Sequence, residues 1–379
     1  MKTKVVVLGA GLIGKPLAID LAKDEKFEIT VADKNWQQLE NISEACIGKK
    51  HLDLRETYEL KKFIQPFDLV VNAVPGFMGY DTLKTVIEAG KDCVDIAFYP
   101  EDVFGLSELA KAKAVRVISD MGVAPGMSNL LTGFAASKMD EVEIVDIFVG
   151  GLPRIRKLPW EYKAVFSPAD VLEEYTRPAR LVENGKIVTK PPLTEIELLD
   201  FEGVGTLEAF NSDGLRSLMF TIKAKNMREK TLRYPGYVEK IKFLAENGFF
   251  DTEKLNFNEQ AVSPLEMTSR LLFKQWKLEE GEEDLTIMKI MVKGKKEGQT
   301  LRYTFDLYDQ YDTETKTHSM ARTTAYAASQ AVRLMFSGLH SEKGIIVPEQ
   351  LGGNEKIVDF MLSGLAKRNV IYKTTLEKG

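Results

Sequence analysis

Short apolar runs recur through the first 150 residues of the chain, and stretches of helical length lie between them. The runs cover residues 4–10, 28–33, 68–74, 92–97 and 116–122, and each suits a strand buried on both faces of a sheet. The helical stretches cover residues 15–24, 35–46, 56–65, 79–90 and 102–113. Such alternation predicts an α/β domain with a doubly wound parallel sheet of the Rossmann type.

The pattern changes after residue 124. Pro125-Gly126 precedes an expected helix with Ser128 or Asn129 near its cap, and EVEIVDIFVGGLP then reads as a strand. Further strand-like runs lie at 163–167, 207–212, 285–294 and 300–310, and the last two flank a turn at 293–299 as an antiparallel hairpin. Helices are expected near residue 170, at 215–229 and at 236–247. These elements predict a mixed α+β domain with a largely antiparallel sheet.

The helical pattern returns after residue 317, beginning with SMARTTAYAASQAVRLMF. A terminal helical section that follows a strand-rich insertion is expected to return to the first domain. We therefore predict a discontinuous first domain, residues 1–124 and about 317–379, and a second domain, residues 125–316.

Composition narrows the class of protein. Hydrophobic residues make up 44% and charged residues 28%, and the net charge of −5 argues against a general nucleic-acid binder. No run of 18 apolar residues predicts a membrane span, and glycines interrupt the apolar N-terminal run, which argues against a signal peptide. Cys46 and Cys93 form no disulfide or zinc pattern, and His51, His318 and His340 lack metal-ligand spacing. We expect a cytoplasmic protein with no metal, nucleic-acid or membrane partner.

Gly9, Gly11 and Gly14 form a G-x-G-x-x-G turn between the first predicted strand and the first predicted helix. The first glycine permits the tight turn, the second lets a pyrophosphate approach the backbone, and the third lets helix and strand pack closely. The free N–H groups and the positive dipole end of the helix would face the phosphates. This context predicts a dinucleotide site.

The second predicted strand ends at Asp33, whose carboxylate is expected to bind the adenosine ribose hydroxyls. It would repel a 2′-phosphate, so NAD is favoured over NADP, although the neighbouring Lys34 softens that preference. Asn72-Ala73-Val74-Pro75 closes another strand, and its loop either passes over the nicotinamide side or is an ordinary turn. The predicted cofactor-binding residues are Gly9, Gly11, Leu12, Ile13, Gly14, Asp33, Asn72, Val74 and Pro75.

Acidic residues follow two further predicted strands. Asp95 precedes Glu101 in DIAFYPED, and Asp120 begins DMGVAPGMSN. A carboxylate at a strand end beside a cofactor is able to orient an amine or accept its proton. The alternative for each acid is a helix cap or a loop hydrogen bond.

Arginines occur in three motifs of the second predicted domain. Arg177 and Arg180 lie in EEYTRPAR, Arg216 follows Asp213 in NSDGLRS, and Arg233 lies in TLRYPGY. Arginine binds carboxylates in bidentate geometry, and it also ties loops together beside Gly and Pro turns. Both roles stay open for each arginine at this stage.

The order of these motifs resembles one known family. The glycine turn, NAVPG, VDIAF, DMGVAPGMSN, GGLP, FSPADVLEEYTRPAR, SDGLRS and TLRYPG together are similar to the saccharopine dehydrogenase family, from residue 4 to beyond residue 350. GGLP and FSPADVLEEYTRPAR are far more specific than the glycine turn. Within the family, the motifs are most similar to the NAD-dependent lysine 6-dehydrogenases.

The resemblance implies oxidation of the ε-amine of L-lysine by NAD, giving 2-aminoadipate 6-semialdehyde and ammonia. It also implies that the second domain supplies much of the substrate pocket and a subunit contact in a homodimer or higher homo-oligomer. Hydride leaves the carbon only after the ammonium loses a proton, so the pocket must lower the amine pKa or supply a base. By charge logic, the amine end is assigned to Asp95, Asp120 or Glu101, the carboxylate end to Arg177 or Arg216, and the α-ammonium to Asp213.

Two alternatives remain. One is a related enzyme acting on saccharopine or carboxynorspermidine, whose extra carboxylates would require further arginines. The other is a catalytically silent NAD-binding sensor protein, which would keep the glycine turn and Asp33 but would not need the polar motifs of the second domain.

Overall fold

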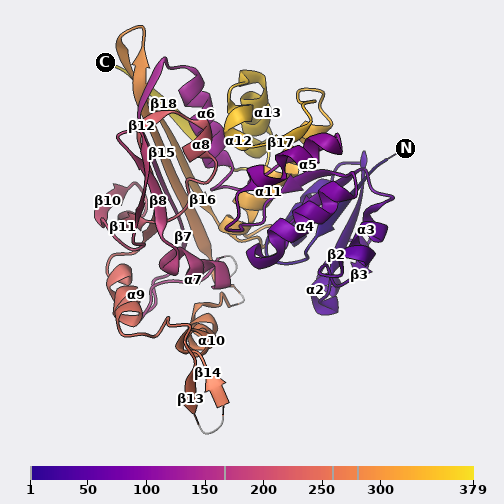
Figure 1. Ribbon diagram of the computed structural model, residues 1–379, viewed down its shortest axis with the longest axis horizontal. Coiled ribbons are helices and arrows are strands. Elements are labelled where there is room, and N and C mark those ends of the chain that lie inside the picture. Colours follow the sequence, from indigo (N-terminus) through magenta and orange to yellow (C-terminus); the bar gives the residue numbers. More distant parts are fainter. Residues whose placement is uncertain (1, 166–167, 258–259, 280) are drawn as a thin grey trace. The chain divides into compact units, whose positions relative to one another are not determined.

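The computed structural model of the protein describes residues 2–165, 168–257, 260–279 and 281–379 (Figure 1). The chain forms two compact units. Unit 1 comprises Met1–Asp140, Phe220–Ile222 and Ala321–Tyr372, and unit 2 comprises Glu141–Met219, Lys223–Met320 and Lys373–Gly379. The first boundary therefore lies after Asp140 instead of residue 124, and the last residues belong to unit 2 instead of unit 1.

The sheet of unit 1 is parallel throughout its described strands, in the order β17-β6-β5-β4-β1-β2-β3. Its strands are β1 (Thr3–Leu8), β2 (Phe27–Asp33), β3 (Gly48–His51), β4 (Leu69–Asn72), β5 (Asp92–Asp95), β6 (Arg116–Ile118) and β17 (Gly344–Ile346). The predicted Rossmann-type sheet is confirmed. The sequence patterns located five of these strands and missed the two edge strands, β3 and β17.

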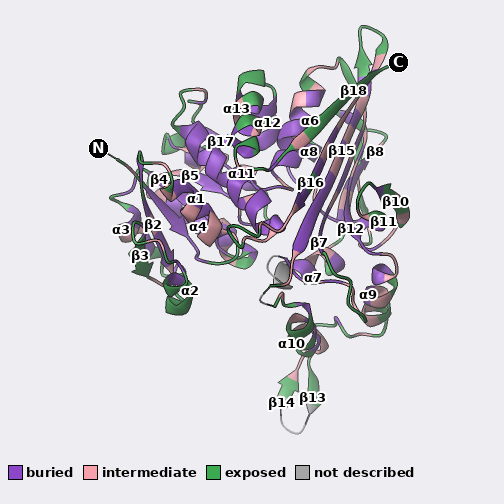
Figure 2. Cartoon of the chain, turned by 180° about the vertical axis from the view of Figure 1, so that it is seen from behind, coloured by how far each residue is buried: buried purple, intermediate pink, exposed green. Residues whose placement is uncertain are grey.

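Burial explains which strands were recognised. Every residue of β4 is buried, and so are the last four residues of β1, because helices cover both faces of a doubly wound sheet (Figure 2). Edge strand β3 instead has the sequence GKKH and is exposed at every position. It carries no hydrophobic signal that a sequence pattern could detect.

Helices connect the strands of unit 1. They are α1 (Gly14–Ala22), α2 (Trp36–Glu40), α3 (Thr57–Ile64), α4 (Gly76–Glu88), the 3₁₀ helix η1 (Val103–Leu106), α5 (Ser107–Ala112), α6 (Met127–Ser137), α11 (Ser319–Met335), α12 (Pro348–Gly352) and α13 (Glu355–Ala366). Helix α1 packs on β1 and β2, α4 packs on β4 and β5, and α5 packs on β17.

Helix α6 explains the shifted unit boundary. It packs against α12 and α13, and Gly133 allows this approach because a Cβ there would lie 2.1 Å from the Glu349 carbonyl oxygen. The predicted side-chain cap at Ser128 or Asn129 is wrong, since Gly126 occupies the N-cap position. Gly126 has φ +134°, and a Cβ there would meet the Gly122 carbonyl oxygen at 2.0 Å.

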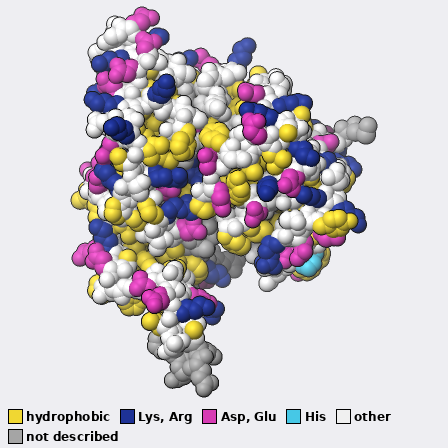
Figure 3. Space-filling model, viewed as in Figure 1, with side chains coloured by type: hydrophobic (Ala, Val, Ile, Leu, Met, Phe, Trp, Pro, Cys, Tyr) yellow, Lys and Arg dark blue, Asp and Glu magenta, His cyan; other side chains and the backbone are white. Residues whose placement is uncertain are grey.

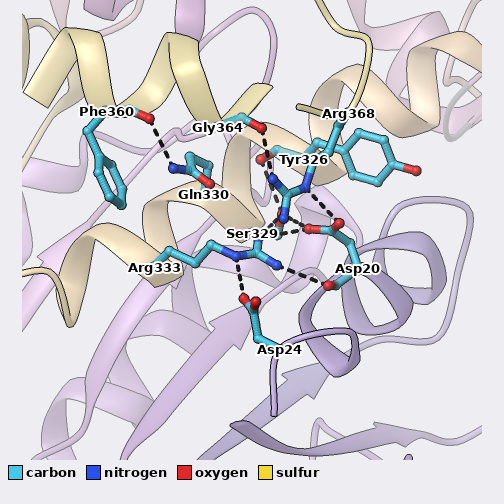
Figure 4. A network of polar contacts seen from close by, with 9 residues as sticks. All are labelled: Asp20, Asp24, Tyr326, Ser329, Gln330, Arg333, Phe360, Gly364 and Arg368. Carbon is cyan, nitrogen blue, oxygen red and sulfur yellow. Dashed lines mark hydrogen bonds and ion pairs between the residues drawn. The ribbon is translucent and has the colours of Figure 1, made fainter. Parts of the chain in front are cut away.

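A buried carboxylate on α1 links the N-terminal and C-terminal segments of unit 1 (Figure 4). Asp20 accepts hydrogen bonds from Arg333 Nη1 at 2.8 Å, from Arg368 Nε at 2.7 Å and from Ser329 Oγ at 2.6 Å. Burial opposes ionisation, but the two guanidinium groups outweigh it and lower the pKa of Asp20. Arg333 also binds Asp24, at 2.6 Å. The helical C-terminal segment is therefore fixed to the helix that follows the glycine turn.

Unit 2 is built on a mixed sheet in the order β10-β11-β12-β7-β15-β16-β18, with β8 and β9 attached beside β12. Its pairings are antiparallel except for β12 with β7, among those with a described register. The strands are β7 (Glu141–Pro153), β8 (Ala179–Glu183), β9 (Lys186–Lys190), β10 (Glu197–Phe201), β11 (Gly205–Asn211), β12 (Ala224–Arg233), β15 (Asp284–Lys296), β16 (Gln299–Gln310) and β18 (Tyr372–Lys378). The predicted largely antiparallel second domain is confirmed, including the hairpin of β15 and β16.

Smaller elements complete unit 2. They are α7 (Pro168–Thr176), α8 (Leu218–Thr221, whose last two residues belong to unit 1), α9 (Tyr237–Glu246), α10 (Pro264–Trp276) and the hairpin of β13 (Leu255–Phe257) and β14 (Gln260–Val262). An aromatic cluster that includes Tyr162, Tyr175, Tyr237 and Trp276 forms the core beneath α7, α9 and α10.

Two local predictions for unit 2 need correction. The helix predicted at 215–229 is only the short α8, and the segment then becomes β12, because pairing with β7 and β11 overrides its helix-forming residues. The strand predicted at 163–167 is also absent at residues 163–165, where Ala164 makes an isolated bridge with Lys277. Phe166 and Ser167 lie outside the described residues.

Charges of both signs are interspersed over the face drawn in Figure 3, without a large area of one sign. This distribution fits the small net charge of −5. Among the helices of the described residues, none is long and apolar enough to cross a membrane.

Replacing Asp20 is expected to destabilise the protein strongly. Asp20→Asn should lower the free energy of unfolding by about 3 kcal/mol at neutral pH, because Arg333 and Arg368 would lose their buried counter-charge. The folded-state pKa of Asp20 lies below its ordinary value of 3.8, so this stabilisation is present above pH 3.8 and is lost as the pH falls through the folded-state pKa. Urea unfolding at pH 7 and pH 3 measures both effects.

Asp24→Asn is the matched control. Asp24 binds the same arginine, but its side chain is 36% exposed, so the loss should stay below about 1 kcal/mol. Equal losses in the two variants would contradict the role assigned to Asp20.

Candidate functional site

The glycine turn has the close backbone contacts that its sequence predicts. Gly9 has φ +107°, and a Cβ on it would lie 2.5 Å from the Ala73 carbonyl oxygen. A Cβ on Gly14 would lie 2.0 Å from the Gly9 carbonyl oxygen. At Gly11, by contrast, a Cβ would meet no heavy atom within 4 Å. The first and third glycines are thus required by the fold, whereas the space at Gly11 is open for a ligand.

The start of α1 fits a phosphate group. No side chain makes a capping hydrogen bond there, and the first turn contains no acidic residue. Its N–H groups and the positive end of the helix dipole are therefore not neutralised by a local carboxylate. Leu12 is 53% exposed beside this turn, and Ile13 is half-buried at the N-cap position.

Asp33 lies at the end of β2 and contacts the glycine turn directly. Its Oδ2 accepts a hydrogen bond from the Ala10 N–H at 2.8 Å, and its Oδ1 accepts one from the Asn35 N–H at 2.7 Å. Next to it, His51 Nε2 lies 2.7 Å from the Lys34 carbonyl oxygen. The carboxylate is half-buried and fixed in direction, as binding a ribose diol requires.

The loop after β4 lies beside the glycine turn, as the contact between Gly9 and Ala73 shows. Val74 is buried, and Pro75 is exposed at the N-cap of α4. Asn72 faces inward, since its Nδ2 donates to the Gly79 carbonyl oxygen at 3.0 Å and to Asp95 Oδ1 at 2.8 Å. Its amide therefore holds the strand ends together and is fully buried.

Asp95 is the centre of a buried polar network at the end of β5. In addition to the Asn72 amide, it accepts hydrogen bonds from the Tyr99 hydroxyl at 2.8 Å, from Ser119 Oγ at 3.1 Å and from the Ala97 N–H at 3.2 Å. Burial raises the pKa of Asp95 to about 7, and the negative charge of Asp120 adds to the shift. Burial therefore favours the protonated form of this carboxyl group.

The other two candidate acids differ in position. Asp120 is buried just beyond β6 and has φ +55°, a left-handed backbone conformation that directs the chain out of the sheet. Glu101 is exposed. Burial raises the pKa of the Tyr80 hydroxyl, and the negative charge of Glu101 adds to this shift. The structure thus brings Asp95 and Asp120 together electrostatically, whereas Glu101 lies on the surface.

In unit 2, the segment between β11 and α8 carries Asp213 and Arg216. Asp213 is buried and binds Arg180 in bidentate geometry, with both N–O distances at 2.8 Å. Arg216 is also buried, with φ +53°. Arg177, near the end of α7, binds Glu173 one turn earlier. Arg180, which was one of several open candidates, is thus the counter-charge of Asp213.

Arg233 lies inside the aromatic cluster of unit 2. Its guanidinium carbon is 4.5 Å from the ring centre of Tyr162 and 5.9 Å from those of Tyr175 and Tyr237. It also donates to the Tyr175 hydroxyl at 3.1 Å and to Glu174 at 3.2 Å. With only 2% of its surface exposed, Arg233 ties β12 to α7 and α9.

A further buried acid, Glu229, lies against the Asp213–Arg216 segment. Glu229 on β12 accepts a hydrogen bond from Ser212 Oγ at 2.7 Å. Burial raises the pKa of Glu229 to about 8; the Ser212 hydrogen bond opposes this shift, and the charges of Glu174 and Asp213 add to it. The sequence patterns did not single out Glu229.

Among the described residues, no three His, Cys, Asp or Glu side chains gather as metal ligands. The histidines have structural surroundings. His318 Nε2 lies 3.2 Å from the Glu282 carbonyl oxygen, and His340 is buried, which lowers the pKa of its imidazole together with the charge of Arg116.

A Rossmann sheet with an open glycine turn, an acid at the end of β2 and buried acids at further strand ends defines a pyridine-nucleotide-dependent oxidoreductase. Two family profiles match the chain: one described as Saccharopine dehydrogenase NADP binding domain over residues 5–118, and one described as Saccharopine dehydrogenase C-terminal domain over residues 122–371. The chain belongs to the saccharopine dehydrogenase family.

Known relatives differ in length and in name. The alpha-aminoadipic semialdehyde synthase of Mus musculus is 25% identical over 70% of this chain, and the match spans only 30% of the mouse protein. The carboxyaminopropylagmatine dehydrogenase of a Synechocystis strain is 23% identical over 97% of this chain and 98% of its own length. The apo saccharopine dehydrogenase (L-Glu forming) of Saccharomyces cerevisiae has the same fold, with a TM-score of 0.80 over 99% of this chain and 100% of the yeast chain at 18% identity.

Replacing Asp95 is expected to change how stability depends on pH. Because its folded-state pKa of about 7 lies above the ordinary 3.8, protonated Asp95 stabilises the fold at low pH, and this contribution disappears as the pH rises towards 7. Asp95→Asn should therefore reduce the loss of stability between pH 5 and pH 8 by about 2–4 kcal/mol. Urea unfolding at both pH values measures the difference.

Asp92→Asn provides the control on the same strand. Asp92 pairs with Arg116 at 2.6 Å and is partly exposed, so its replacement should leave the change between pH 5 and pH 8 as in the wild type. An unchanged slope in Asp95→Asn would show that Asp95 does not titrate in this range.

Proposed function

We propose that the protein is an NAD-dependent dehydrogenase that oxidises the ε-amine of L-lysine to 2-aminoadipate 6-semialdehyde and releases ammonia. The observation that carries the proposal is the pair of buried acids, Asp95 and Asp120, at the carboxyl ends of β5 and β6 in a dinucleotide-binding sheet. Ligands of doubly wound sheets bind at the carboxyl ends of the strands. The choice of lysine follows from the resemblance of the second-domain motifs.

The nucleotide, when bound, supplies the hydride acceptor. The open space at Gly11 and the uncapped start of α1 fit its pyrophosphate, and Asp33 fits an unphosphorylated adenosine ribose. A 2′-phosphate would meet the negative charge of Asp33 directly. We therefore propose NAD as the cofactor, although the matching family profile is described by NADP.

The acids support the proton transfers. The ε-ammonium loses one proton, the neutral amine gives up hydride from its carbon to form an iminium, and water then converts the iminium to aldehyde and ammonium. We assign the first proton to Asp120, because it is buried just beyond β6, at the strand ends where ligands of doubly wound sheets bind. The negative charge of Asp120 helps to raise the pKa of Asp95, and exposed Glu101 is the weaker candidate for the proton transfer.

Arg216 is our preferred residue for the α-carboxylate. Arg177, which contacts Glu173 at the end of α7, is the alternative. A buried arginine in a turn gives a fixed direction to its guanidinium group, and guanidinium binds carboxylate in bidentate geometry. The pairing with Arg180 weakens the case for Asp213 as the ligand of the α-ammonium, since its carboxylate is already neutralised.

A second candidate is a dehydrogenase for a longer, carboxylated amine. The match to the protein named carboxyaminopropylagmatine dehydrogenase favours it, because it spans 97% of this chain and 98% of that relative. A substrate of this kind would use Arg177 as well as Arg216. In either case we propose a homodimer or higher homo-oligomer.

The experiment that tests the proposal is a substrate screen. Purified protein with NAD should reduce the nucleotide in the presence of L-lysine, measured as absorbance at the NADH wavelength, and should release an equal amount of ammonia. Saccharopine, carboxynorspermidine and ornithine are tested separately as alternative substrates. Turnover of saccharopine or carboxynorspermidine without turnover of lysine would select the second candidate. NAD binding without turnover of any amine would select the silent sensor.

Asp33 should determine the choice of nucleotide. Asp33→Ser removes the negative charge that a 2′-phosphate would meet, so KM for NADP should fall and KM for NAD should rise, each by about tenfold. The measurement is steady-state kinetics with both nucleotides on whichever amine the screen identifies.

Asp68→Ser is the matched control. Asp68 also accepts a hydrogen bond from a backbone N–H, that of Lys4 at 2.7 Å. However, it directly precedes β4 and therefore lies at the amino ends of the strands, opposite to Asp33. Its replacement should leave the ratio of the two KM values unchanged. A similar shift in both variants would remove Asp33 from the role of selecting NAD.

A further inference from the structure

The segment Ser212–Ser217 carries two candidate substrate contacts and needs a defined backbone. Asp213 and Arg216 lie only three positions apart in it, and Arg216 has a left-handed backbone at φ +53°. A non-glycine residue in this region is uncommon and persists where the surroundings hold it. A group of the surrounding structure must therefore hold this segment.

Gly214 identifies that group. A Cβ on Gly214 would lie 2.3 Å from Glu229 Oε2 and 2.4 Å from Glu229 Cδ, so the carboxyl group lies directly against the segment backbone. No side chain larger than hydrogen fits at position 214 without moving Glu229. The Gly214 N–H also donates a hydrogen bond to this carboxyl group.

Ser212 adds a second connection. Its Oγ donates to Glu229 Oε2 at 2.7 Å and lies 2.8 Å from Thr231 Oγ1, two residues along β12. Glu229 is 5% exposed, and its carboxyl group thus contacts the segment on both sides of Asp213. Asp213 in turn binds Arg180. The Glu229 carboxyl group therefore supports the segment that holds this ion pair.

We propose that Glu229 is a positioning residue: its carboxyl group holds the Ser212 hydroxyl and the Gly214 backbone and thereby fixes where Arg216 presents its charge and where Asp213 binds Arg180. Glu229 acts through the segment and does not touch the substrate. The proposal rests on the proposed function and deepens it, because Arg216 is the residue assigned there to the α-carboxylate of the substrate.

The surroundings explain why a neutral group suffices. The charges that act on Glu229 are those of Glu174 on α7 and of Asp213, and both are negative. Burial among them favours the protonated acid near neutral pH, with its pKa at about 8. Shape and hydrogen bonding therefore define the role, and glutamine, which has the same shape without the charge, should fill it.

Two variants test the proposal. Glu229→Asp shortens the side chain by one methylene and withdraws the carboxyl group from Gly214 and Ser212. It should raise KM for the amine substrate about tenfold, with little change in kcat or in KM for NAD, as expected from the loss of one or two hydrogen bonds. Glu229→Gln should restore KM to within about twofold of the wild type. The amine is whichever one the screen identifies.

A measurement without substrate separates this proposal from the proposed function. Hydrogen–deuterium exchange should become faster in peptides covering residues 212–217 of Glu229→Asp and should stay slow in Glu229→Gln. Peptides from β15 and β16 report whether the whole unit is destabilised. Glu143→Asp, the same chemical change on β7 beside Lys295, is the control and should change neither KM nor exchange.

Faster exchange confined to 212–217, together with the selective KM effect, supports the positioning role even if lysine is not the substrate. Two results would overturn it: an unchanged exchange rate in Glu229→Asp, or equal rises of KM for amine and nucleotide. If Glu229→Asp does not fold, Ser212→Ala removes one contact alone and should show a smaller effect of the same kind. No effect of Ser212→Ala on KM or exchange would likewise count against the proposal.

Discussion

The close backbone approach at the end of β1 is the constraint on which the rest of unit 1 depends. Neither Gly9 nor Gly14 has room for a Cβ, and the nearest atoms are backbone carbonyl oxygens that cannot turn away. This approach places the Ala10 N–H against Asp33 and the loop after β4 against Gly9. The candidate nucleotide contacts at three strand ends therefore follow from one tight turn.

That turn requires α1 to be held firmly, and the C-terminal segment supplies the support. Arg333 on α11 and Arg368 beyond α13 converge on Asp20, more than 300 positions away in the chain. The return of the C-terminal helices to the first domain was predictable from their pattern. The ion pairs were not, because a sequence gives no indication of which buried arginine meets which aspartate.

The predictable parts of the fold are those with a strong local signal. Continuous apolar runs located β1, β2, β4, β5 and β6, and an alternating strand pair around Glu297-Gly298 located the hairpin. Edge strand β3 has no apolar residue to reveal it, and β12 has helix-forming residues whose conformation is decided by its neighbours in the sheet. Tertiary pairing decides such segments, and local propensity does not.

The same distinction applies to the candidate site. Glycine spacing and an acid at a strand end predict the candidate nucleotide site. These signals are local, because each residue lies directly after the strand that reveals it. On the substrate side, partners come from different strands, so the pairing of Arg180 with Asp213 and the support of Gly214 by Glu229 became visible only in the structure.

Three buried acids show that neighbours determine what burial does to a carboxyl group. Asp20 faces two guanidinium groups and its pKa falls, whereas Asp95 and Glu229 receive hydrogen bonds from neutral donors, lie near other acids, and have raised pKa values of about 7 and about 8. An ionised acid without a counter-charge destabilises a fold. Asp95 and Glu229 lie beneath the candidate amine and carboxylate contacts, respectively. Their cost to stability is therefore concentrated where the proposed chemistry requires fixed positions, whereas Asp20 stabilises the fold by fixing the C-terminal segment to α1.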